Sequence, residues 1–558
     1  MTQRSLGTRV TAALAVTALA LTGCASDGGD SGADKKTVHA NKDFNFLSAS
    51  YDELRDGGDY VTGLSELSEQ QNRFHADSTR YTTDLWRWYN PHLIYFTPEG
   101  EPVANEAYIE SMNEEMVDGN TVVTFKLNKD AKFNDGTPID VTAFQTYWEI
   151  NRGDNDAYAP KSTDGFEQIT SVEPGADNFE VKVTFDGPYL YWPGLFTDMA
   201  HPALKDPANY NSYLKQLHPE WGAGPYTVEN VDFNKGEVVF VRNDKWWGKP
   251  GKLDRRIFRY MEDKAAINAF KNGEIDSLAL NAKESYQSVK DMPGIAINDA
   301  PDTRTTLTVL NSNSEVLKDV HVREAVTRGI NRSTITDIVF NGMPYEGEPV
   351  GSLIMFPFQP GYSDNFDKVG GFDPEKSAQI LDEAGWTVGA DGFREKDGQK
   401  LSLTYVLFGD LEVSKAMATA TQKMLKDVGV DVVIDNRPGS EFSKTLRNRD
   451  FDILPMAWGA TDPYGIAYMG QMFFADSELN KSDTGSAEID EKIRQLQQMD
   501  NAEEQIKFAN EIEEDVFALF GLIPNYNPAR VVATKEGIAN VGATGFAVFP
   551  AELIGWKK

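Results

Sequence analysis

Polar and apolar residues alternate in two segments of the first third of the chain. Residues 121–127 place their apolar side chains on one face, and residues 179–185 repeat the pattern. Such alternation is typical of strands that bury one face. Between the two segments, Val141, Phe144 and Trp148 recur at the spacing of one helix face. We therefore expect a small mixed α/β unit in this region.

The middle of the chain adds further strands and one clear helix. Short strands are predicted at 225–228 and 236–241, separated by polar turns. A helix then carries Ala266, Ile267 and Phe270 on one face and ends at a glycine, residue 273, suited to a left-handed conformation. The pattern returns to strands followed by helices.

Strands and helices alternate after residue 302. Strands are predicted at 307–310, 401–407 and 430–434, and helices at 320–330 and 413–428. A further helix begins at an N-cap formed by residues 373 and 374, an Asp-Pro pair, and ends at a glycine at 385. Alternation of this kind favours a mainly parallel sheet with helices on both faces.

The amino terminus has the pattern of an export signal. Arg4 and Arg9 precede an apolar run from residue 10 to residue 21, which at about 1.5 Å per residue is too short to cross a membrane. Cys24 is the only cysteine and follows Leu-Thr-Gly, a segment that resembles the lipobox of bacterial lipoproteins. We predict a signal peptide at 1–23, and a lipidated Cys24 that begins a flexible Gly/Ser/Asp-rich tether, 24–43.

Composition and charge narrow the possible partners. The chain has 558 residues, enough for about three to four structural units, and its 40% of hydrophobic residues is typical of a folded protein. The formal net charge of −32 repels phosphate backbones. Nucleic acid is therefore a poor candidate partner.

The sequence carries no recognisable catalytic or metal-binding motif. The six histidines are scattered, and none pairs with another at metal-ligand spacing. The nucleophile-elbow, phosphate-loop and dinucleotide fingerprints are missing from the sequence. Residues 154–156 resemble the start of a calcium loop, but Ala159 stands where that loop needs glycine. We expect no catalytic residue, metal or cofactor.

Six segments, in order along the chain, resemble motifs of the family 5 extracellular solute-binding proteins, the oligopeptide- and dipeptide-binding receptors of bacterial ABC importers. The resemblance extends over roughly residues 50 to 535. Each motif alone is weak, and their shared order makes chance improbable. The segments are 123–127 followed by 131–138 (AKFNDGTP), 222–226 (GAGPY), 242–247 (RNDKWW), 273–276 (GEID), 319–326 (DVHVREAV), and 372–376 with 383–386 (FDPEK and EAGW).

The resemblance implies an α/β, two-lobed periplasmic-binding-protein-like fold of type II, with an additional small α/β domain in the first lobe. The second lobe closes over the ligand. The implied limits are 44–90, 222–301 and 525–558 for lobe I, 91–221 for the small domain, and 302–524 for lobe II.

Residues for ligand binding are also implied by the resemblance. In peptide-binding relatives a carboxylate a few residues after a tryptophan meets the ligand's α-ammonium group, and Trp458 and Asp462 stand in a similar segment, with one residue more between them than usual. Asp462 could instead match the Asp-Pro that comes later in the motif. The loop with Asp77, Ser78 and Thr79 falls where relatives present groups to the cleft, although a surface turn is an alternative. Two tryptophans, Trp86 and Trp88, could line the cleft or pack in the core.

The resemblance thus implies a monomeric receptor that captures short peptides and delivers them to the permease and ATPase subunits of an ABC importer. Cys24 would anchor it to the outer face of the cell membrane. A nickel chelate, haem or an oligosaccharide could replace the peptide on the same fold. A secreted hydrolase and a surface adhesin remain as alternatives of other classes.

Overall fold

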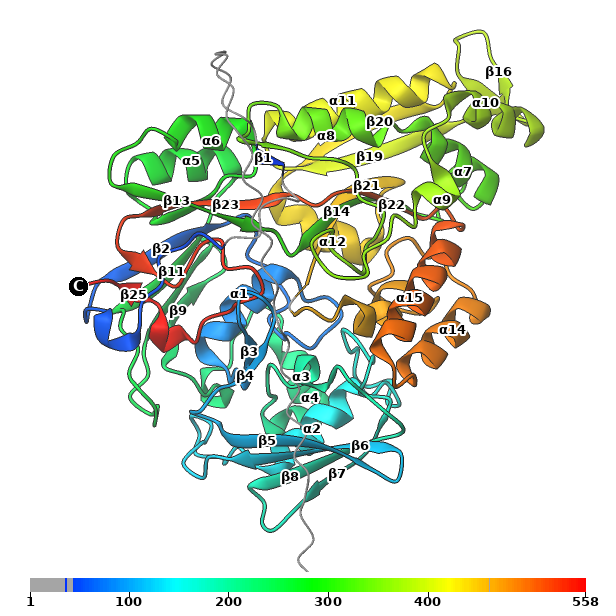
Figure 1. The fold of residues 1–558 in the computed structure, drawn as a ribbon. Helices are drawn as coiled ribbons and strands as arrows, with labels where there is room; N and C mark the ends of the chain where they lie inside the picture. The colour runs from blue at the N-terminus through cyan, green and yellow to red at the C-terminus, as the bar shows by residue number, and fades with distance from the viewer. Residues whose placement is uncertain (1–35, 38–43, 461) are drawn as a thin grey trace, which may run out of the picture. The chain divides into compact units, whose positions relative to one another are not determined.

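Three sheets of four or more strands organise the part of the chain that the structure describes (Figure 1). The computed structural model describes residues 36–37, 44–460 and 462–558. The signal peptide, Cys24 and most of the tether expected from the sequence lie outside the described residues. Residues 36–37 form a short strand, β1 (Lys36–Thr37), which pairs in parallel with β15 (Tyr345–Glu346).

The largest sheet has seven strands in the order β13-β23-β12-β2-β11-β10-β9. Apolar clusters cover both of its faces, one with α1 and the other with α5 and α6. We call this sheet and its covering elements lobe I. Its strands are β2 (Asp59–Leu64), β9 (Tyr226–Asp232), β10 (Glu237–Arg242), β11 (Arg255–Tyr260), β12 (Ser277–Ala279), β13 (Ile295–Pro301) and β23 (Ala529–Lys535), and its helices are α1 (Arg80–Tyr89), α5 (Asp263–Lys271) and α6 (Lys283–Val289).

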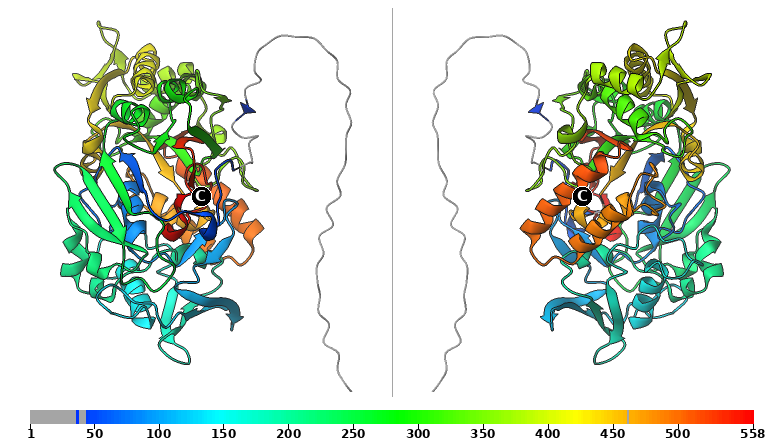
Figure 2. Two further views of the ribbon diagram at one scale, coloured as in Figure 1. Left: turned by 90° about the vertical axis from the view of Figure 1, so that its left-hand side faces the viewer. Right: turned by 90° about the vertical axis from the view of Figure 1, so that its right-hand side faces the viewer.

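A five-stranded sheet, in the order β20-β19-β21-β14-β22, forms the centre of lobe II. Helices pack on it around the largest apolar cluster, and α14 and α15 lie side by side (Figures 1 and 2). The strands are β14 (Arg304–Leu310), β19 (Ser402–Phe408), β20 (Asp431–Arg437), β21 (Ile453–Gly459) and β22 (Leu522–Tyr526). The main helices are α7 (Val320–Gly329), α8 (Arg332–Phe340), α10 (Pro374–Glu383), α11 (Glu412–Asp427), α12 (Phe442–Asn448), α14 (Ala487–Gln497) and α15 (Ala502–Phe517).

A four-stranded antiparallel sheet, in the order β5-β6-β8-β7, forms the small domain together with α2 (Val141–Asn151). Its core is aromatic, with Phe125, Phe144 and Phe196 in mutual contact. The strands are β5 (Ile109–Val117), β6 (Asn120–Leu127), β7 (Ile169–Pro174) and β8 (Glu180–Phe185). The fold is therefore two-lobed and α/β, with an additional small α/β domain.

The remaining elements are short. They are β3 (Ile94–Phe96), β4 (Pro102–Ala104), β16 (Thr387–Val388), β17 (Arg394–Lys396), β18 (Gln399–Lys400), β24 (Ile538–Ala539), β25 (Gly555–Trp556), α3 (Trp192–Leu195), α4 (Pro207–Tyr210), α9 (Asp367–Gly370) and α13 (Met469–Phe473). None of the helices in the described part of the chain is long and apolar enough to cross a membrane.

The chain crosses between the two large sheets in two short segments. One joins β13 to β14 through residues 302–303, and the other joins β22 to β23 through residues 527–528. The side-chain amide of Asn527 donates hydrogen bonds to the carbonyl oxygens of Asp302 (2.9 Å) and Arg304 (2.7 Å), so the two crossings are tied together.

Several sequence predictions agree closely with these elements. The segments expected at 179–185 and 413–428 correspond to β8 and α11, and Asp373 accepts a hydrogen bond from the Lys376 amide at the start of α10. The glycine at 385 has a positive φ of 85°, as a helix terminator requires.

The expectation of mainly parallel sheets was wrong. Both large sheets are mixed: β12, β2 and β11 run parallel in lobe I, and β20, β19 and β21 in lobe II. The strands next to the crossings, β13, β14, β22 and β23, run antiparallel to their neighbours. Strand-helix alternation does not reveal this, because β14 and β23 enter their sheets from the other lobe, and β13 and β22 lead into those crossings without a helix between.

Candidate ligand-binding cavity

A cavity of about 350 Å³ opens at the carboxyl ends of the parallel strands of lobe I. Residues within and just after β2, β11 and β12 line it, together with one face of α1, parts of α5, α6 and β23, the segment 542–554, and Leu411 of lobe II. Small-molecule sites typically measure about 300–1,000 Å³, and in open α/β sheets they lie at the carboxyl ends of the strands. This position makes the cavity, which we call the arginine cavity, the candidate ligand-binding site.

Helix α1 presents charged side chains to the arginine cavity. Arg80, Asp84 and Arg87 follow one another at intervals of four and three residues, so they share a face of the helix. Thr79 is the N-cap of the helix, and its backbone amide donates a hydrogen bond to the Thr82 hydroxyl oxygen (3.3 Å) in a capping arrangement. The cap fixes where the helix starts and thereby which of its residues reach the cavity.

Arg256, on β11, lies at the bottom of the cavity and is 4% exposed. Its terminal nitrogens donate to the carbonyl oxygens of Tyr60 (2.9 Å) and Ile257 (2.7 Å) and to the hydroxyl of Thr62 (2.6 Å), while its Nε is buried without a partner. The guanidinium lies 3.6 Å from the ring centroid of Phe258. Burial lowers the pKa of Arg256 to about 10, so the group stays charged at neutral pH.

Arg530, on β23, is half-buried beside the second crossing between the lobes. Within the described residues its side chain has neither an ion pair nor a hydrogen bond. Burial lowers the pKa of Arg530, and the positive charges of Arg304 and Arg80 act in the same direction, whereas the negative charges of Asp302 and Asp84 oppose them. The three guanidinium groups are therefore close enough to repel one another.

Two carboxylates, Asp84 and Asp263, also line the arginine cavity. Asp263 is the first residue of α5. Burial and the negative charges of Asp410 and Glu262 together raise the pKa of Asp263 to about 6, although the positive charge of Arg80 opposes this shift. The surroundings of Asp263 are thus acidic, and an arriving cation would relieve the repulsion there.

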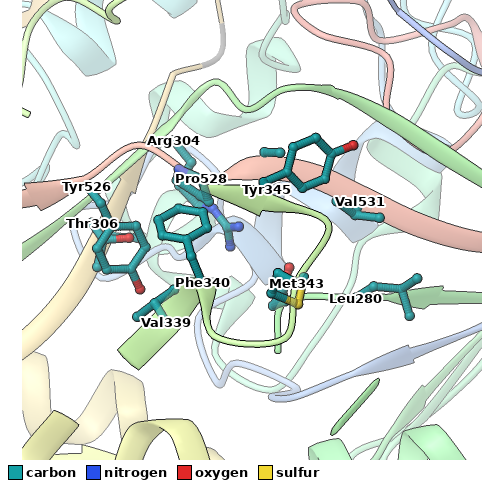
Figure 3. Close-up of a pocket in the computed structure, with 13 residues that line it drawn as sticks. Leu280, Arg304, Thr306, Val339, Phe340, Met343, Tyr345, Tyr526, Pro528 and Val531 are labelled. Atoms are coloured by element: carbon teal, nitrogen blue, oxygen red, sulfur yellow. The ribbon is translucent and has the colours of Figure 1, made fainter. Parts of the chain in front are cut away.

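A second cavity, of about 220 Å³, adjoins the crossings between the lobes (Figure 3). Its wall is mostly apolar and aromatic, with Phe340, Met343 and Tyr345 among the side chains that line it. Arg304 enters this wall but already pairs with Asp302 at 2.7 Å. Asn281 lines both cavities, so the second one adjoins the arginine cavity.

The residues expected from the tryptophan segment line neither cavity. Asp462 is 1% exposed and accepts hydrogen bonds from the Tyr464 amide (2.8 Å) and the Tyr468 hydroxyl (2.5 Å). Trp458 is half-buried on β21, with its ring centroid 6.2 Å from that of Phe473. The structure thus places both in contacts within lobe II, and their role in binding stays a prediction.

The loop before α1 also lies outside both cavities. The carboxylate of Asp77 is 3.8 Å from Arg447 of lobe II, and the Ser78 hydroxyl donates to the carbonyl of Arg73 at 3.0 Å. The third residue of this set, Thr79, is the N-cap of α1. These residues connect the lobes and begin the helix, and their role in binding stays a prediction.

Trp86 and Trp88 lie in different parts of the molecule, one in an apolar core and the other at the arginine cavity. Trp86 is 2% exposed and packs edge-on against Phe74 in the core of the small domain. Trp88 lines the arginine cavity and lies beneath the guanidinium of Arg256 at 5.1 Å. The structure thus gives a packing position to Trp86 and a cavity position to Trp88.

Sequence analysis missed the arginines of the cavity, although one signal was present. Arg256 and Phe258 occupy alternate positions of β11 that face the core, where a charged residue is unusual. Arg80 and Arg530 have no comparable local signal, because more than 400 residues of sequence separate them. No group of three or more His, Cys, Asp or Glu side chains suited to a metal occurs within residues 36–37, 44–460 and 462–558.

Comparison with known proteins gives consistent results. The family model of the bacterial extracellular solute-binding proteins, family 5 (middle region), matches residues 104–480. The oligopeptide-binding protein OppA of Mycobacterium tuberculosis is 29% identical over 557 residues, covering 97% of this chain and 93% of that protein. The nickel-binding periplasmic protein of Escherichia coli is 25% identical over 437 residues, covering 73% of this chain and 80% of that protein.

A solved structure has the same fold. The periplasmic EDTA-binding protein EppA superposes with a TM-score of 0.78 at 23% identity, and the alignment covers 94% of this chain and all of that one.

Proposed function

The chain belongs to the bacterial extracellular solute-binding proteins, family 5, and we propose that, as the binding component of an ABC importer, it captures short peptides in the arginine cavity. The peptide is released unchanged to a membrane permease. One observation carries this proposal: the cavity lies along the carboxyl halves of the parallel lobe I strands, is lined by lobe I residues and by Leu411 of lobe II, and presents charges of both signs.

A short peptide matches this lining because its two ends carry opposite charges. We assign its α-ammonium group to Asp263, where Asp410 and Glu262 add negative charge. The carboxylate would meet the arginines of α1 and β23. Asp462 is the alternative partner for the ammonium group, and a peptide would there compete with the Tyr468 hydroxyl.

Ligand capture would be coupled to movement about the two crossings. Lobe I would comprise 44–90, 222–301 and 525–558, the small domain 91–221, and lobe II 302–524. A ligand that touches both lobes favours the state in which they are together, and about 5.5 kcal/mol of differential contact shifts a population from 1:99 to 99:1. The permease would then recognise this state.

The amino terminus would hold the receptor at the outer face of the cell membrane. Removal of residues 1–23 would expose Cys24, whose thiol can carry a lipid, and residues 24–43 would act as the tether. The protein would act as a monomer without catalysis or a cofactor. Metabolic labelling with a fatty acid tests the anchor: Cys24→Ser should abolish incorporation, and continued incorporation would contradict it.

The proposed function is tested by identifying the ligand and following its fate. Native mass spectrometry of the purified protein should show a copurifying short peptide, recovered with unchanged mass after incubation. Small-angle X-ray scattering should show a contraction when that peptide is added to ligand-free protein. A metal chelate or sugar in place of the peptide, or a ligand returned cleaved, would overturn the proposal.

The ammonium assignment is tested by comparing two variants. Asp263→Asn should weaken the binding of peptides with free amino termini more than that of acetylated peptides, measured by isothermal titration calorimetry. Asp462→Asn serves as the matched comparison. A selective loss in Asp462→Asn alone would move the ammonium site to the tryptophan segment, and equal losses for both kinds of peptide would remove Asp263 from this role.

A further inference from the structure

The arginine cavity is rich in positive charge although the protein as a whole is strongly acidic. Its lining contains four arginines, Arg80, Arg87, Arg256 and Arg530, and two aspartates, Asp84 and Asp263. The formal net charge of the chain is −32. With this net charge, an average patch of the protein's surface contains more acidic than basic side chains. The cavity has the opposite balance, and this difference needs a specific explanation.

The donors of these arginines are not fully used by the protein. The Nε atoms of Arg87 and Arg256 are buried without a partner. The side chain of Arg530 makes no hydrogen bond or ion pair within the described residues. Each guanidinium carries five N–H donors, and a buried donor without an acceptor costs about 1–3 kcal/mol. The free donors fit acceptors that a ligand supplies.

The nearby carboxylates do not balance this charge. The carboxylate of Asp302 already accepts two hydrogen bonds from the Arg304 guanidinium, at 2.7 and 3.1 Å. Asp84 can neutralise one arginine. Asp263 lies in acidic surroundings with Asp410 and Glu262, and the charge of Arg80 also acts on it. Asp84 and Asp302 attract Arg80 and Arg530 in turn. The side chains that line the cavity comprise four arginines and two aspartates, so the lining carries an excess of positive charge.

We propose that the captured solute is a small molecule of net negative charge with two or more carboxylates, bound by Arg80 and Arg530 with Arg256 beneath them. Guanidinium groups bind carboxylates through two parallel N–H···O bonds, and these charge-assisted bonds are about twice as strong as neutral ones. An acidic short peptide meets this requirement, and so does a free polycarboxylate. The inference rests on the proposed function, because it specifies the ligand of the same cavity.

Titration with matched ligands tests the charge requirement. The purified full-length protein is titrated calorimetrically with Glu-Glu, with its neutral isostere Gln-Gln, with Lys-Lys and with citrate. One to two charge-assisted bonds predict that Glu-Glu binds about 10–100-fold more tightly than Gln-Gln. Lys-Lys should bind more weakly than either. Equal affinities for Glu-Glu and Gln-Gln would overturn the inference.

Variants assign the effect to the cavity. Arg530→Gln and Arg80→Gln should each weaken Glu-Glu binding about 10-fold or more, and Gln-Gln binding by a smaller factor, because Gln-Gln offers these arginines only its terminal carboxylate. Arg152→Gln is the matched control, because Arg152 pairs with Asp154 at the surface of the small domain. The control should leave both affinities unchanged. Circular dichroism checks that each variant is folded. If one of the two cavity variants does not fold, the other still tests the inference.

The outcomes separate this inference from the proposed function. If Glu-Glu and Gln-Gln bind equally well and both contract the protein in solution scattering, the peptide function stands and the charge requirement falls. If citrate binds and no peptide does, the charge requirement stands and the peptide function falls. Binding of Lys-Lys alone would contradict the charge requirement, and the absence of any binding would contradict both.

Discussion

Arg394 in lobe II and Arg256 in lobe I are each 4% exposed, yet their surroundings differ. Arg394 donates from all three nitrogens, to the carbonyl oxygens of Val428, Trp386 and Ala378 and to the carboxylate of Asp382. Arg256 has hydroxyl and carbonyl acceptors for two nitrogens, and in the described part of the chain it has none for Nε and no carboxylate within ion-pair distance.

The same contrast separates the arginines of the cavity from other buried arginines. Arg332 of lobe II donates to the carbonyl oxygens of Val350 and Pro524 and pairs with Asp367, and Arg323 donates to three carbonyl oxygens. In the arginine cavity, Arg87 and Arg530 lack such acceptors. Burial alone therefore does not distinguish a structural arginine from a ligand-binding one. The distinction lies in whether the protein itself satisfies the N–H donors.

The largest effect is expected for a structural arginine. Arg394→Met leaves the three carbonyl oxygens without a charged donor and should lower the free energy of unfolding by about 3 kcal/mol or more. Chemical denaturation measures the loss. Arg152→Met, at a surface ion pair, should cost less than about 1 kcal/mol. A loss below 1 kcal/mol for Arg394→Met would remove the distinction between the two groups of arginines.

The buried acid of lobe II should make stability depend on pH. Glu513 is fully buried and accepts hydrogen bonds from the Leu353 amide (2.7 Å) and the Asn365 side chain (2.8 Å). Burial raises the pKa of Glu513 to about 7. Because this value lies above that of an unfolded glutamate, the folded protein binds the proton more tightly. The resulting stabilisation is complete below about pH 4 and is lost as the pH rises to about 7.

Glu513→Gln should therefore reduce the fall in unfolding free energy between pH 5 and pH 8 by about 2–3 kcal/mol. Urea denaturation at several pH values measures the difference. Asp164 and Glu552, whose pKa values are also raised to about 7, keep part of the dependence in the variant. Glu511→Gln, at an exposed position of the same helix, is the control and should leave the slope unchanged. An unaltered slope in Glu513→Gln would contradict the assignment.

A cavity arginine should contribute far less to stability than Arg394. Without ligand, Arg530→Gln removes a charge that Arg304 and Arg80 repel and that Asp302 and Asp84 attract, so we expect the free energy of unfolding to change by less than about 1 kcal/mol. Differential scanning calorimetry of ligand-free protein measures the change. A loss as large as that of Arg394→Met would show that Arg530 is a structural residue.

The local elements of this fold could be predicted from sequence because local pattern determines them. Residues 121–127 alternate and form β6, and Val141, Phe144 and Trp148 share a face of α2. Strand direction could not be predicted, since it depends on which lobe a strand enters from. β14 and β22 pair although more than 200 residues separate them, and no local pattern records that pairing.

The candidate site was predicted less well than the fold, for the same physical reason. Arg80, Arg256 and Arg530 come from three distant segments, and only the sheet of lobe I brings them to one cavity. The family resemblance predicted Asp462 as a ligand-binding residue instead. In the structure, the oxygens of Asp462 accept hydrogen bonds from Tyr464 and Tyr468. A charged residue at an inward-facing strand position, as at Arg256, was the available clue.

The smallest effect is expected at an arginine that belongs to neither group. Arg447, on α12 of lobe II, is exposed and lies 3.8 Å from Asp77 and 3.9 Å from Glu69 of lobe I. Exposed pairs of this kind contribute about 0.2–1 kcal/mol, and salt screens them. Arg447→Gln acts on the contact between the lobes and not on the ligand, so the affinities for Glu-Glu and Gln-Gln should fall equally, by about fivefold at most. Isothermal titration calorimetry at low and at high salt measures both affinities. The difference in affinity between Arg447→Gln and the unaltered protein should disappear at high salt. A loss confined to Glu-Glu would place Arg447 with the ligand-binding arginines and extend their group into lobe II.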